Sequence, residues 1–317
     1  MRFGETSFIC RAITGRTQCS TMIVIGGSAS EDLASKVANE LRIEAGRIEV
    51  RRFPDGEKYL RVLSDVKGQS VAVIQSIHHT PDELLFEYLL LADTLKDLGA
   101  KKVVAFIPYF AYARQDERFK PGEALSFMTV SKLIESVGTD EIFTIDMHQH
   151  RVLKSSQVFR IPSHNLSAMP LLADHVQKFG RLQNPLVIGP DAEAEQWAKV
   201  AAERMRTDYD VFEKKRFGDA QVEIRPRRSN AKGRDVLIVD DIISTGGTIV
   251  EAVKILQSQG AGRIQVACTH PILAQGALEK INGAGVEGVV GTDTVPSPIS
   301  VVTVAPLIAE QLKKTAD

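Results

Sequence analysis

The sequence predicts an α/β protein made of two tandem, doubly wound domains with mainly parallel sheets. Its 317 residues suffice for two domains of ordinary size. Along most of the chain, short runs rich in β-branched residues alternate with segments that have the periodicity of a helix. Most of these runs are apolar at successive positions, which indicates strands buried on both faces of a parallel sheet.

The first elements follow this pattern in order. A strand is expected at 22–25 and a helix at 31–41, where leucine and valine recur four residues apart. A strand at 71–74 then precedes a long helix at 81–98, which has Pro81 in its first turn. The remaining strands are expected at 103–107, 142–145, 186–188, 236–239, 263–268 and 301–304.

A weak internal repeat indicates how the chain divides. The segments 71–75 and 99–104 flank one loop and helix, and 236–240 and 260–265 flank another in the same order. Each half is therefore expected to form one α/β domain, with the break where proline and asparagine interrupt the pattern. The expected domains are residues 22–164 and 165–317.

Residues 1–21 differ from the rest of the chain, because they are rich in Ser, Thr and Arg and poor in acidic residues. We interpret them as a disordered extension or as the product of a misassigned start codon. A transit peptide is the alternative, but the segment lacks the pattern of an amphipathic helix.

The composition excludes several classes of protein. The formal net charge is −1, whereas a protein that binds duplex nucleic acid usually has a basic excess. The cysteines, Cys10, Cys19 and Cys268, have no spacing typical of a zinc site or a disulfide framework. No apolar run approaches the roughly 18 residues that a membrane-spanning helix needs. We therefore expect a cytoplasmic protein with neither nucleic acid nor a membrane as its partner.

The most informative segment is 236–249. Here an apolar strand ends in Asp240 and Asp241, a short loop follows, and a helix begins. Ligands of open α/β sheets bind at the carboxyl ends of strands, and the amides of a helix N-terminus bind anions. Two carboxylates beside an anion site suit the vicinal hydroxyls of a ribose better than the alternative, a helix cap followed by a turn. The loop residues in this candidate site are Ser244, Thr245, Gly246, Gly247 and Thr248.

This segment closely resembles the ribose-phosphate-binding loop of the phosphoribosyltransferase-fold family. The resemblance implies that both domains are phosphoribosyltransferase-like and that Asp240, Asp241 and residues 244–248 bind ribose 5-phosphate. The family includes transferases that consume 5-phosphoribosyl 1-diphosphate and synthetases that make it from ATP, and this loop does not distinguish them. A synthetase would hold ATP without a Walker-A loop, because no G-x-x-x-x-G-K-[ST] pattern occurs.

Three further segments resemble the synthetases, the ribose-phosphate pyrophosphokinases. In the first, 52–58, Phe53 can stack on a purine, and Asp55 and Glu57 can accept hydrogen bonds from its amino group. Taken alone, this segment fits a charged turn equally well. The resemblance implies that Phe53, Asp55, Gly56 and Glu57 bind ATP.

The second segment, 108–120, follows the strand 103–107 and contains Tyr-Ala-Arg-Gln-Asp. A solvated charged loop is the alternative, but this motif is nearly diagnostic of the synthetases and implies that Arg114 and Gln115 contact ATP.

In the third segment, 212–218, Lys214 and Arg216 would share one face of a strand. Two cations on one face suit a transition state that spreads charge over transferring phosphoryl oxygens, whereas a solvent-facing strand is the alternative. The resemblance implies that both residues are catalytic and that Arg216 also contacts ribose 5-phosphate.

The resemblance also implies a divalent metal, Mg²⁺, whose ligands are His148 and Asp191. Both residues follow expected strands, and His150 is either a further participant or simply a polar surface residue. Histidine is an atypical magnesium ligand, so its assignment rests on the resemblance alone.

The function implied is the transfer of the β,γ-diphosphate of Mg-ATP to the anomeric hydroxyl of ribose 5-phosphate, for nucleotide biosynthesis. The N-terminal domain would bind ATP, the C-terminal domain would bind ribose 5-phosphate, and the last helix would pack back on the N-terminal domain. Two rival functions remain: a phosphoribosyltransferase, which leaves Arg114, Lys214 and Arg216 unexplained, and a regulatory paralogue without activity.

Two departures from the commonest synthetases indicate which branch of the synthetase family the chain resembles. Many synthetases have a third acid where this chain has Ser244, and the stretch 120–126 also differs from the usual form. Both features resemble the branch typified by archaeal members. A homo-oligomer is expected, of a size that the sequence leaves open.

Overall fold

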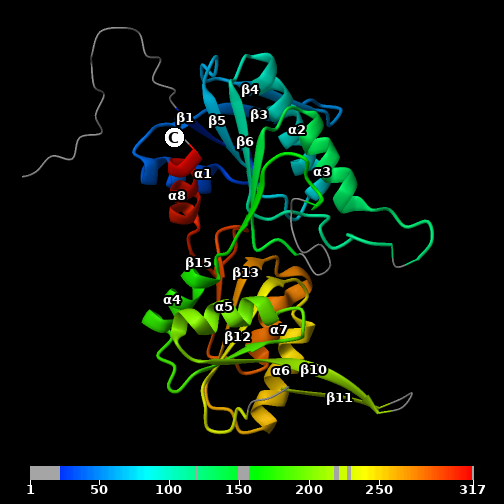
Figure 1. Cartoon of the computed structure of the whole chain (residues 1–317), viewed down its shortest axis with the longest axis vertical. Helices are drawn as coiled ribbons and strands as arrows, with labels where there is room; N and C mark the ends of the chain where they lie inside the picture. Colours follow the sequence, from blue (N-terminus) through cyan, green and yellow to red (C-terminus); the bar gives the residue numbers. More distant parts are fainter. Residues whose placement is uncertain (1–21, 119, 149–156, 218–220, 227–229, 316–317) are drawn as a thin grey trace, which may run out of the picture.

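The computed structural model describes residues 22–118, 120–148, 157–217, 221–226 and 230–315, with side chains outside 214–226. The expectations for residues 1–21 and for His150 lie outside these ranges. Two sheets lie one beyond the other along the long axis of the molecule (Figure 1). Within the described ranges, no helix is long and apolar enough to span a bilayer.

The first sheet has six strands, and every neighbouring pair in it is parallel. Its central strands are buried because Val and Ile occupy both faces, as the unbroken apolar runs predicted. In spatial order the strands are β2 (Ala45–Gly46), β1 (Met22–Gly26), β5 (Ser70–Ile74), β6 (Lys102–Ile107), β7 (Glu141–Ile145) and β8 (Ser163–Leu166).

The second sheet has seven strands and is parallel except for one edge pair, β10 with β11. That pair forms a ribbon that extends away from the body of the sheet (Figure 1). In spatial order the strands are β11 (Gln221–Pro226), β10 (Asp208–Phe217), β9 (Leu186–Gly189), β12 (Val236–Ile243), β13 (Ile264–Pro271), β14 (Gly288–Thr292) and β15 (Ser300–Val302).

Helices cover both faces of each sheet, which makes both domains doubly wound. On the first sheet, α2 (Pro81–Asp97) and α3 (Ser126–Ser136) cover one face, and α1 (Glu31–Leu41) and α8 (Ala305–Thr315) cover the other. On the second sheet, α6 (Gly247–Ser258) and α7 (Ala277–Gly283) oppose α4 (Met169–Phe179) and α5 (Glu195–Met205). The predicted fold class, two tandem phosphoribosyltransferase-like domains, is confirmed.

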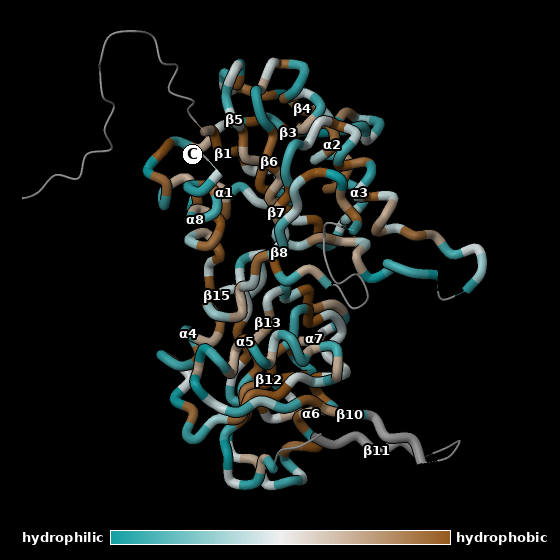
Figure 2. Tube along the Cα trace, in the orientation of Figure 1, coloured by the Kyte–Doolittle hydropathy of each residue, from teal (hydrophilic) through white to brown (hydrophobic). Residues whose placement is uncertain are grey.

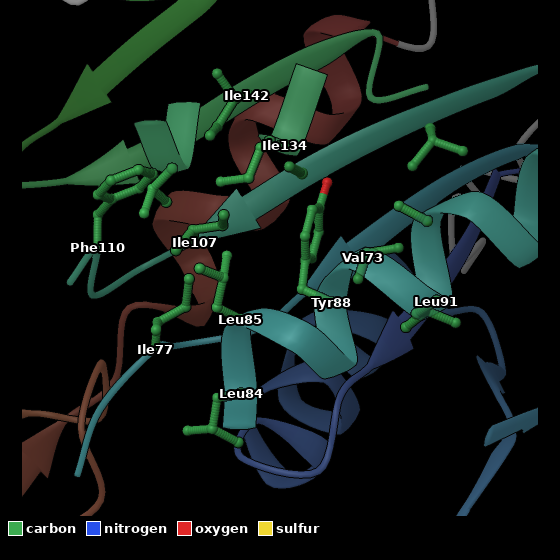
Figure 3. Close-up of a cluster of buried hydrophobic side chains, with 14 of the residues drawn as sticks. Val73, Ile77, Leu84, Leu85, Tyr88, Leu91, Ile107, Phe110, Ile134 and Ile142 are labelled. Atoms are coloured by element: carbon green, nitrogen blue, oxygen red, sulfur yellow. The ribbon is translucent and has the colours of Figure 1, made fainter. Parts of the chain in front are cut away.

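The cores lie between these helices and the sheets. Apolar segments run through the interior of both sheets, and polar segments concentrate in the connections (Figure 2). In the first domain, Tyr88 and Leu91 of α2 point into a cluster that also contains Ile107 and Ile134 (Figure 3). The phenol of Tyr88 is buried, and its oxygen lies 2.7 Å from Oγ1 of Thr139.

Two connections cross between the domains. The last helix, α8, lies beside α1 on the first sheet, although the second sheet separates the two helices in sequence (Figure 1). The expected boundary between 164 and 165 falls inside β8, which pairs with β7 of the first sheet. The division after residue 164 stays a prediction.

A separate two-stranded sheet stands beside α2. It consists of β3 (Ile48–Arg52) and β4 (Lys58–Val62), which pair antiparallel from Ile48↔Val62 to Arg52↔Lys58. Among the described strands it is hydrogen-bonded to neither large sheet. The turn of this hairpin carries the residues from Phe53 to Glu57.

Candidate functional site

The two large sheets meet at their carboxyl edges. Ser76, which follows β5, donates a hydrogen bond through its hydroxyl to the carbonyl of Thr294 at 2.5 Å. Nε2 of His270 on β13 lies 2.9 Å from the carbonyl oxygen of Ile145 at the end of β7. Because ligands of parallel sheets bind at carboxyl edges, this interdomain seam is the candidate site.

Asp240 and Asp241 lie inside β12, which continues to Ile243, and not beyond its end as the sequence indicated. Asp241 is 2% exposed and Asp240 is partly buried. Burial raises the pKa of Asp241 to about 7, and burial together with the neighbouring Asp241 raises the pKa of Asp240. Two adjacent carboxyl groups in such a buried position are suited to hydrogen bonding with hydroxyl groups of a ligand.

The loop after β12 presents the first turn of α6 toward solvent. Thr245, Gly247 and Thr248 are exposed, and no side chain of the described residues caps the helix. Gly246 has φ +77°, which favours glycine, and a Cβ there would crowd the side chain of Ile281 at 3.2 Å. The uncapped helix start and the helix dipole suit this loop, called the anion loop below, to binding an anion.

Across the seam, a cavity of about 260 Å³ opens beside the first domain. The cavity is lined by residues that include Tyr109, Tyr112, Arg114, Gln115, Ser126 and His148. The predicted pair Arg114 and Gln115 therefore shares a cavity with His148. Tyr109, Tyr112 and Ser126 were not predicted as site residues, although Tyr112 is the first residue of the motif that carries Arg114 and Tyr109 lies three residues before it.

His148 connects the two sides of the site. Its Nδ1 lies 2.7 Å from Oδ2 of Asp241. Burial, and then the positive charge of Arg114, lowers the pKa of His148 to about 4, against the opposing charges of Glu193 and Asp191. The imidazole is therefore neutral near pH 7.

Asp191, the other predicted metal residue, lies at the start of the connection from β9 to α5. Its Oδ1 accepts hydrogen bonds from the amides of Glu193 at 3.0 Å and Ala194 at 3.1 Å. Its charge acts on both His148 and Asp240, so it faces the same cleft. Among the described residues, no group of three or more His, Cys, Asp and Glu side chains is arranged around one ion position.

Asp146 is a residue that the sequence reasoning did not single out. It is 3% exposed, and its Oδ2 accepts from the amide of Ala168 at 2.8 Å and from the hydroxyl of Thr269 at 2.7 Å. Burial raises its pKa, and hydrogen bonds from Thr269, Ser167, Ala168 and Trp197 oppose that effect. A carboxylate with this many donors fastens the segment before His148 to the second domain.

Two residues of this region have a strained backbone. Asp146 has φ +38° and Tyr112 has φ +69°, both in the left-handed region that non-glycine residues rarely adopt. Such residues cost on the order of 1–3 kcal/mol each and concentrate at functional sites.

The structure does not bring every predicted residue into this cavity. Phe53 is 41% exposed on the β3–β4 turn, where its ring meets that of Tyr59 edge-on at 5.8 Å. Asp55, Gly56 and Glu57 are also exposed there. Lys214 and Arg216 lie two apart on β10, opposite Ile224 and Val222 of β11, and their side chains are outside the description.

Two doubly wound domains, one of which has an anion loop after a strand that carries two aspartates, define a protein of the phosphoribosyltransferase type. Residues 22–138 match the profile of the N-terminal domain of ribose phosphate pyrophosphokinase, and residues 154–284 match that of the phosphoribosyl transferase domain.

Full-length relatives narrow the class. The chain is 46% identical to a ribose-phosphate pyrophosphokinase of Methanothermobacter thermautotrophicus, over 92% of this chain and 100% of that protein. It is 42% identical to that of Methanobrevibacter smithii, with the same coverage of both chains. The crystal structure of a phosphoribosylpyrophosphate synthetase from Mycobacterium smegmatis superposes with a TM-score of 0.83 at 27% identity, covering 93% of this chain and 98% of that one. The chain belongs to the ribose-phosphate pyrophosphokinase family, and the predicted resemblance to archaeal members is confirmed.

Proposed function

We propose that the chain carries out the reaction of its family in the cleft between the two sheets. The β,γ-diphosphate of ATP moves to the anomeric oxygen of ribose 5-phosphate, giving 5-phosphoribosyl 1-diphosphate and AMP. The observation that carries this proposal is the hydrogen bond between His148 and Asp241, because it joins the Arg114 cavity of one domain to the anion loop of the other. A phosphoribosyltransferase does not bind a nucleoside triphosphate, so it would not need the Arg114 cavity beside the anion loop.

Ribose 5-phosphate occupies the second domain in this proposal. Its phosphate binds the amides and hydroxyls of residues 244–248 at the start of α6, where the helix dipole favours negative charge. Its hydroxyls donate hydrogen bonds to the carboxyl oxygens of Asp240 and Asp241, which lie side by side in β12. Arg216 adds a contact to the same substrate.

ATP binds the first domain. Arg114 and Gln115 contact the phosphates in the 260 Å³ cavity, and Phe53 stacks on the purine. Asp55, Gly56 and Glu57 complete the purine contacts.

The anomeric oxygen attacks the β-phosphorus in line, and the bond from that phosphorus to the oxygen of AMP breaks. Lys214, Arg216 and Arg114 stabilise the negative charge on the transferring oxygens, so catalysis consists of positioning and electrostatics.

We further propose that Mg²⁺ accompanies ATP, held by His148 and Asp191. Magnesium is commonly bound through one or two carboxylates, substrate phosphates and water, so one protein carboxylate such as that of Asp191 suffices. Asp191 has one oxygen engaged with backbone amides and a second oxygen to offer. When bound, the ion offsets the charge of the triphosphate.

The active protein is proposed to be a cytoplasmic homo-oligomer. Sedimentation of the purified chain at several concentrations tests the oligomer: a monomer at every concentration would contradict it.

The activity is tested by incubating the purified chain with ATP, ribose 5-phosphate and Mg²⁺ and measuring AMP and 5-phosphoribosyl 1-diphosphate together. Equal amounts of both products, abolished by EDTA, are expected. ADP in place of AMP would mean a simple kinase, and the absence of both products would favour a regulatory subunit.

A further inference from the structure

Glu87 is a fully buried carboxylate outside the cleft. It lies on α2, and its side chain is 0% exposed. Its Oε1 accepts from the amide of Ser28 at 2.7 Å and from Nε2 of Gln75 at 3.1 Å. Its Oε2 accepts from the hydroxyl of Ser28 at 2.8 Å and from Nζ of Lys58 at 2.5 Å. A charge is buried only when such partners compensate the loss of hydration. The four donors therefore hold the carboxylate of Glu87 in the interior.

The donors come from three separate parts of the first domain. Ser28 follows β1 and Gln75 follows β5, so both belong to the carboxyl edge of the sheet. Lys58 is the first residue of β4 in the separate hairpin, and its side chain is only 10% exposed. Glu87 therefore links the hairpin to the edge of the sheet where substrates bind.

The remaining contacts of the hairpin explain why this link matters. Ile48, Leu60 and Val62 pack on the core cluster of the first domain, and such apolar contacts have no preferred direction. Hydrogen bonds are directional. Lys58 makes a second one, to the carbonyl of Glu83 at 3.2 Å, and Arg52 donates one to the carboxylate of Glu83 at 2.5 Å. The pair of Arg52 and Glu83 is about half exposed, so the pair of Lys58 and Glu87 is the buried directional link of the hairpin. Lys58 directly follows Glu57, the last residue of the turn.

We propose that Glu87, acting through Lys58, is a positioning residue that sets the orientation of the turn Phe53–Glu57 for the nucleotide. This inference rests on the proposed function of that turn in binding the purine. Loss of the ion pair raises KM for ATP, leaves KM for ribose 5-phosphate unchanged, and loosens the turn itself. A misplacement of about 1 Å can cost on the order of a hundredfold in rate at a positioned site, so kcat/KM for ATP should fall by roughly tenfold to a hundredfold, mainly through a higher KM for ATP.

The test uses Lys58→Met and Glu87→Gln, with Lys102→Met as the matched control. Lys102 forms an ion pair of 2.6 Å with Glu141 at the opposite edge of the same sheet, and the two side chains are 34% and 11% exposed. Steady-state kinetics gives KM for each substrate. Hydrogen exchange measures the amides of Phe53 and Gly56, which are bonded within the turn at 2.8 and 2.9 Å. Both test variants should exchange faster there, with no change in α6, and the control should match the wild type in both measurements.

The double variant Lys58→Met/Glu87→Gln guards against loss of folding, because it leaves no uncompensated charge in the interior. Its KM for ATP should remain raised, since the buried directional link is still missing and the exposed pair of Arg52 and Glu83 contributes little. Recovery of the wild-type KM would overturn the proposal, because the single variants would then have acted only through a buried charge.

Phe53→Ala separates this inference from the function on which it rests. A raised KM for ATP in Phe53→Ala, with wild-type kinetics and exchange in Lys58→Met, would refute only the positioning role. An unchanged KM for ATP in Phe53→Ala would refute the purine-binding turn, and with it the proposal. Faster exchange at the turn in Lys58→Met would then identify Glu87 as a structural anchor alone.

Discussion

Replacement of His270 by glutamine should change how the stability of this protein depends on pH. The ring is 1% exposed, and its nitrogens lie 2.9 Å from Oγ1 of Thr294 and 2.9 Å from the carbonyl oxygen of Ile145. Burial lowers the pKa of His270 to about 3. In the unfolded chain the pKa of histidine is about 6.5. Between these two values the unfolded state binds a proton that the folded state does not bind.

The sign and the size of the effect follow from proton linkage. Stability falls as pH drops below about 6.5, because protonation favours the unfolded state. One pH unit corresponds to about 1.36 kcal/mol, so the pH interval from 6.5 to 5.0 removes about 2 kcal/mol of stability. His270→Gln lacks this proton and keeps an amide that can donate to Ile145. The stability advantage of the wild type over the variant should therefore shrink by about 2 kcal/mol between pH 7.5 and pH 5.0.

Urea unfolding of both proteins at these two pH values measures the difference, and it cancels the contributions of groups common to both. Thr294→Val is the control: it removes the hydroxyl beside the ring but keeps the buried histidine. Its offset from the wild type should be the same at both pH values. A pH-independent difference between the wild type and His270→Gln would refute the reasoning.

Three further predictions concern other parts of the molecule. Lys214→Ala should lower kcat by roughly 10²-fold or more while ribose 5-phosphate still binds in calorimetry; unchanged turnover would remove Lys214 from the mechanism. Tyr88→Phe leaves the buried hydroxyl of Thr139 unpaired and should cost about 1–2 kcal/mol in denaturant unfolding, whereas Tyr88→Phe/Thr139→Val should recover most of it. Asp146→Asn places an amide against donors and should lower both stability, by about 1–3 kcal/mol, and kcat; full activity would argue against a positioning role for Asp146.

The fold was predictable because most of its strands are recognisable from a short stretch of sequence. Val71 and Val73 face one core cluster, and Ala72 and Ile74 face the other, so the run 71–74 had to be apolar throughout. The β3–β4 hairpin was not expected, because its strands are half-buried and mix charged with apolar residues. Short β8, with two exposed residues among its four, gives no apolar run.

The candidate site was predictable only where a motif is contiguous. The segment 240–248 has its candidate residues at consecutive positions, and the structure places both aspartates inside β12 and begins α6 at Gly247. The roles of these residues stay predictions. Asp146 and Glu87 carried no such signal. The hydrogen bond from Thr269 to Asp146 spans 123 residues, and that from Ser28 to Glu87 spans 59. A buried carboxylate is recognisable once the fold has supplied its partners, and not before.

The position of α8 has a consequence for the order in which the chain can fold during synthesis. Ile308 and Leu312 of this helix are buried against Leu33 and Val37 of α1, so they cover apolar surface on the first domain. Domains usually fold as they emerge from the ribosome, the N-terminal one first. Here the first domain to be translated is the last to be completed, because one face of its sheet waits for a helix encoded beyond the whole second domain.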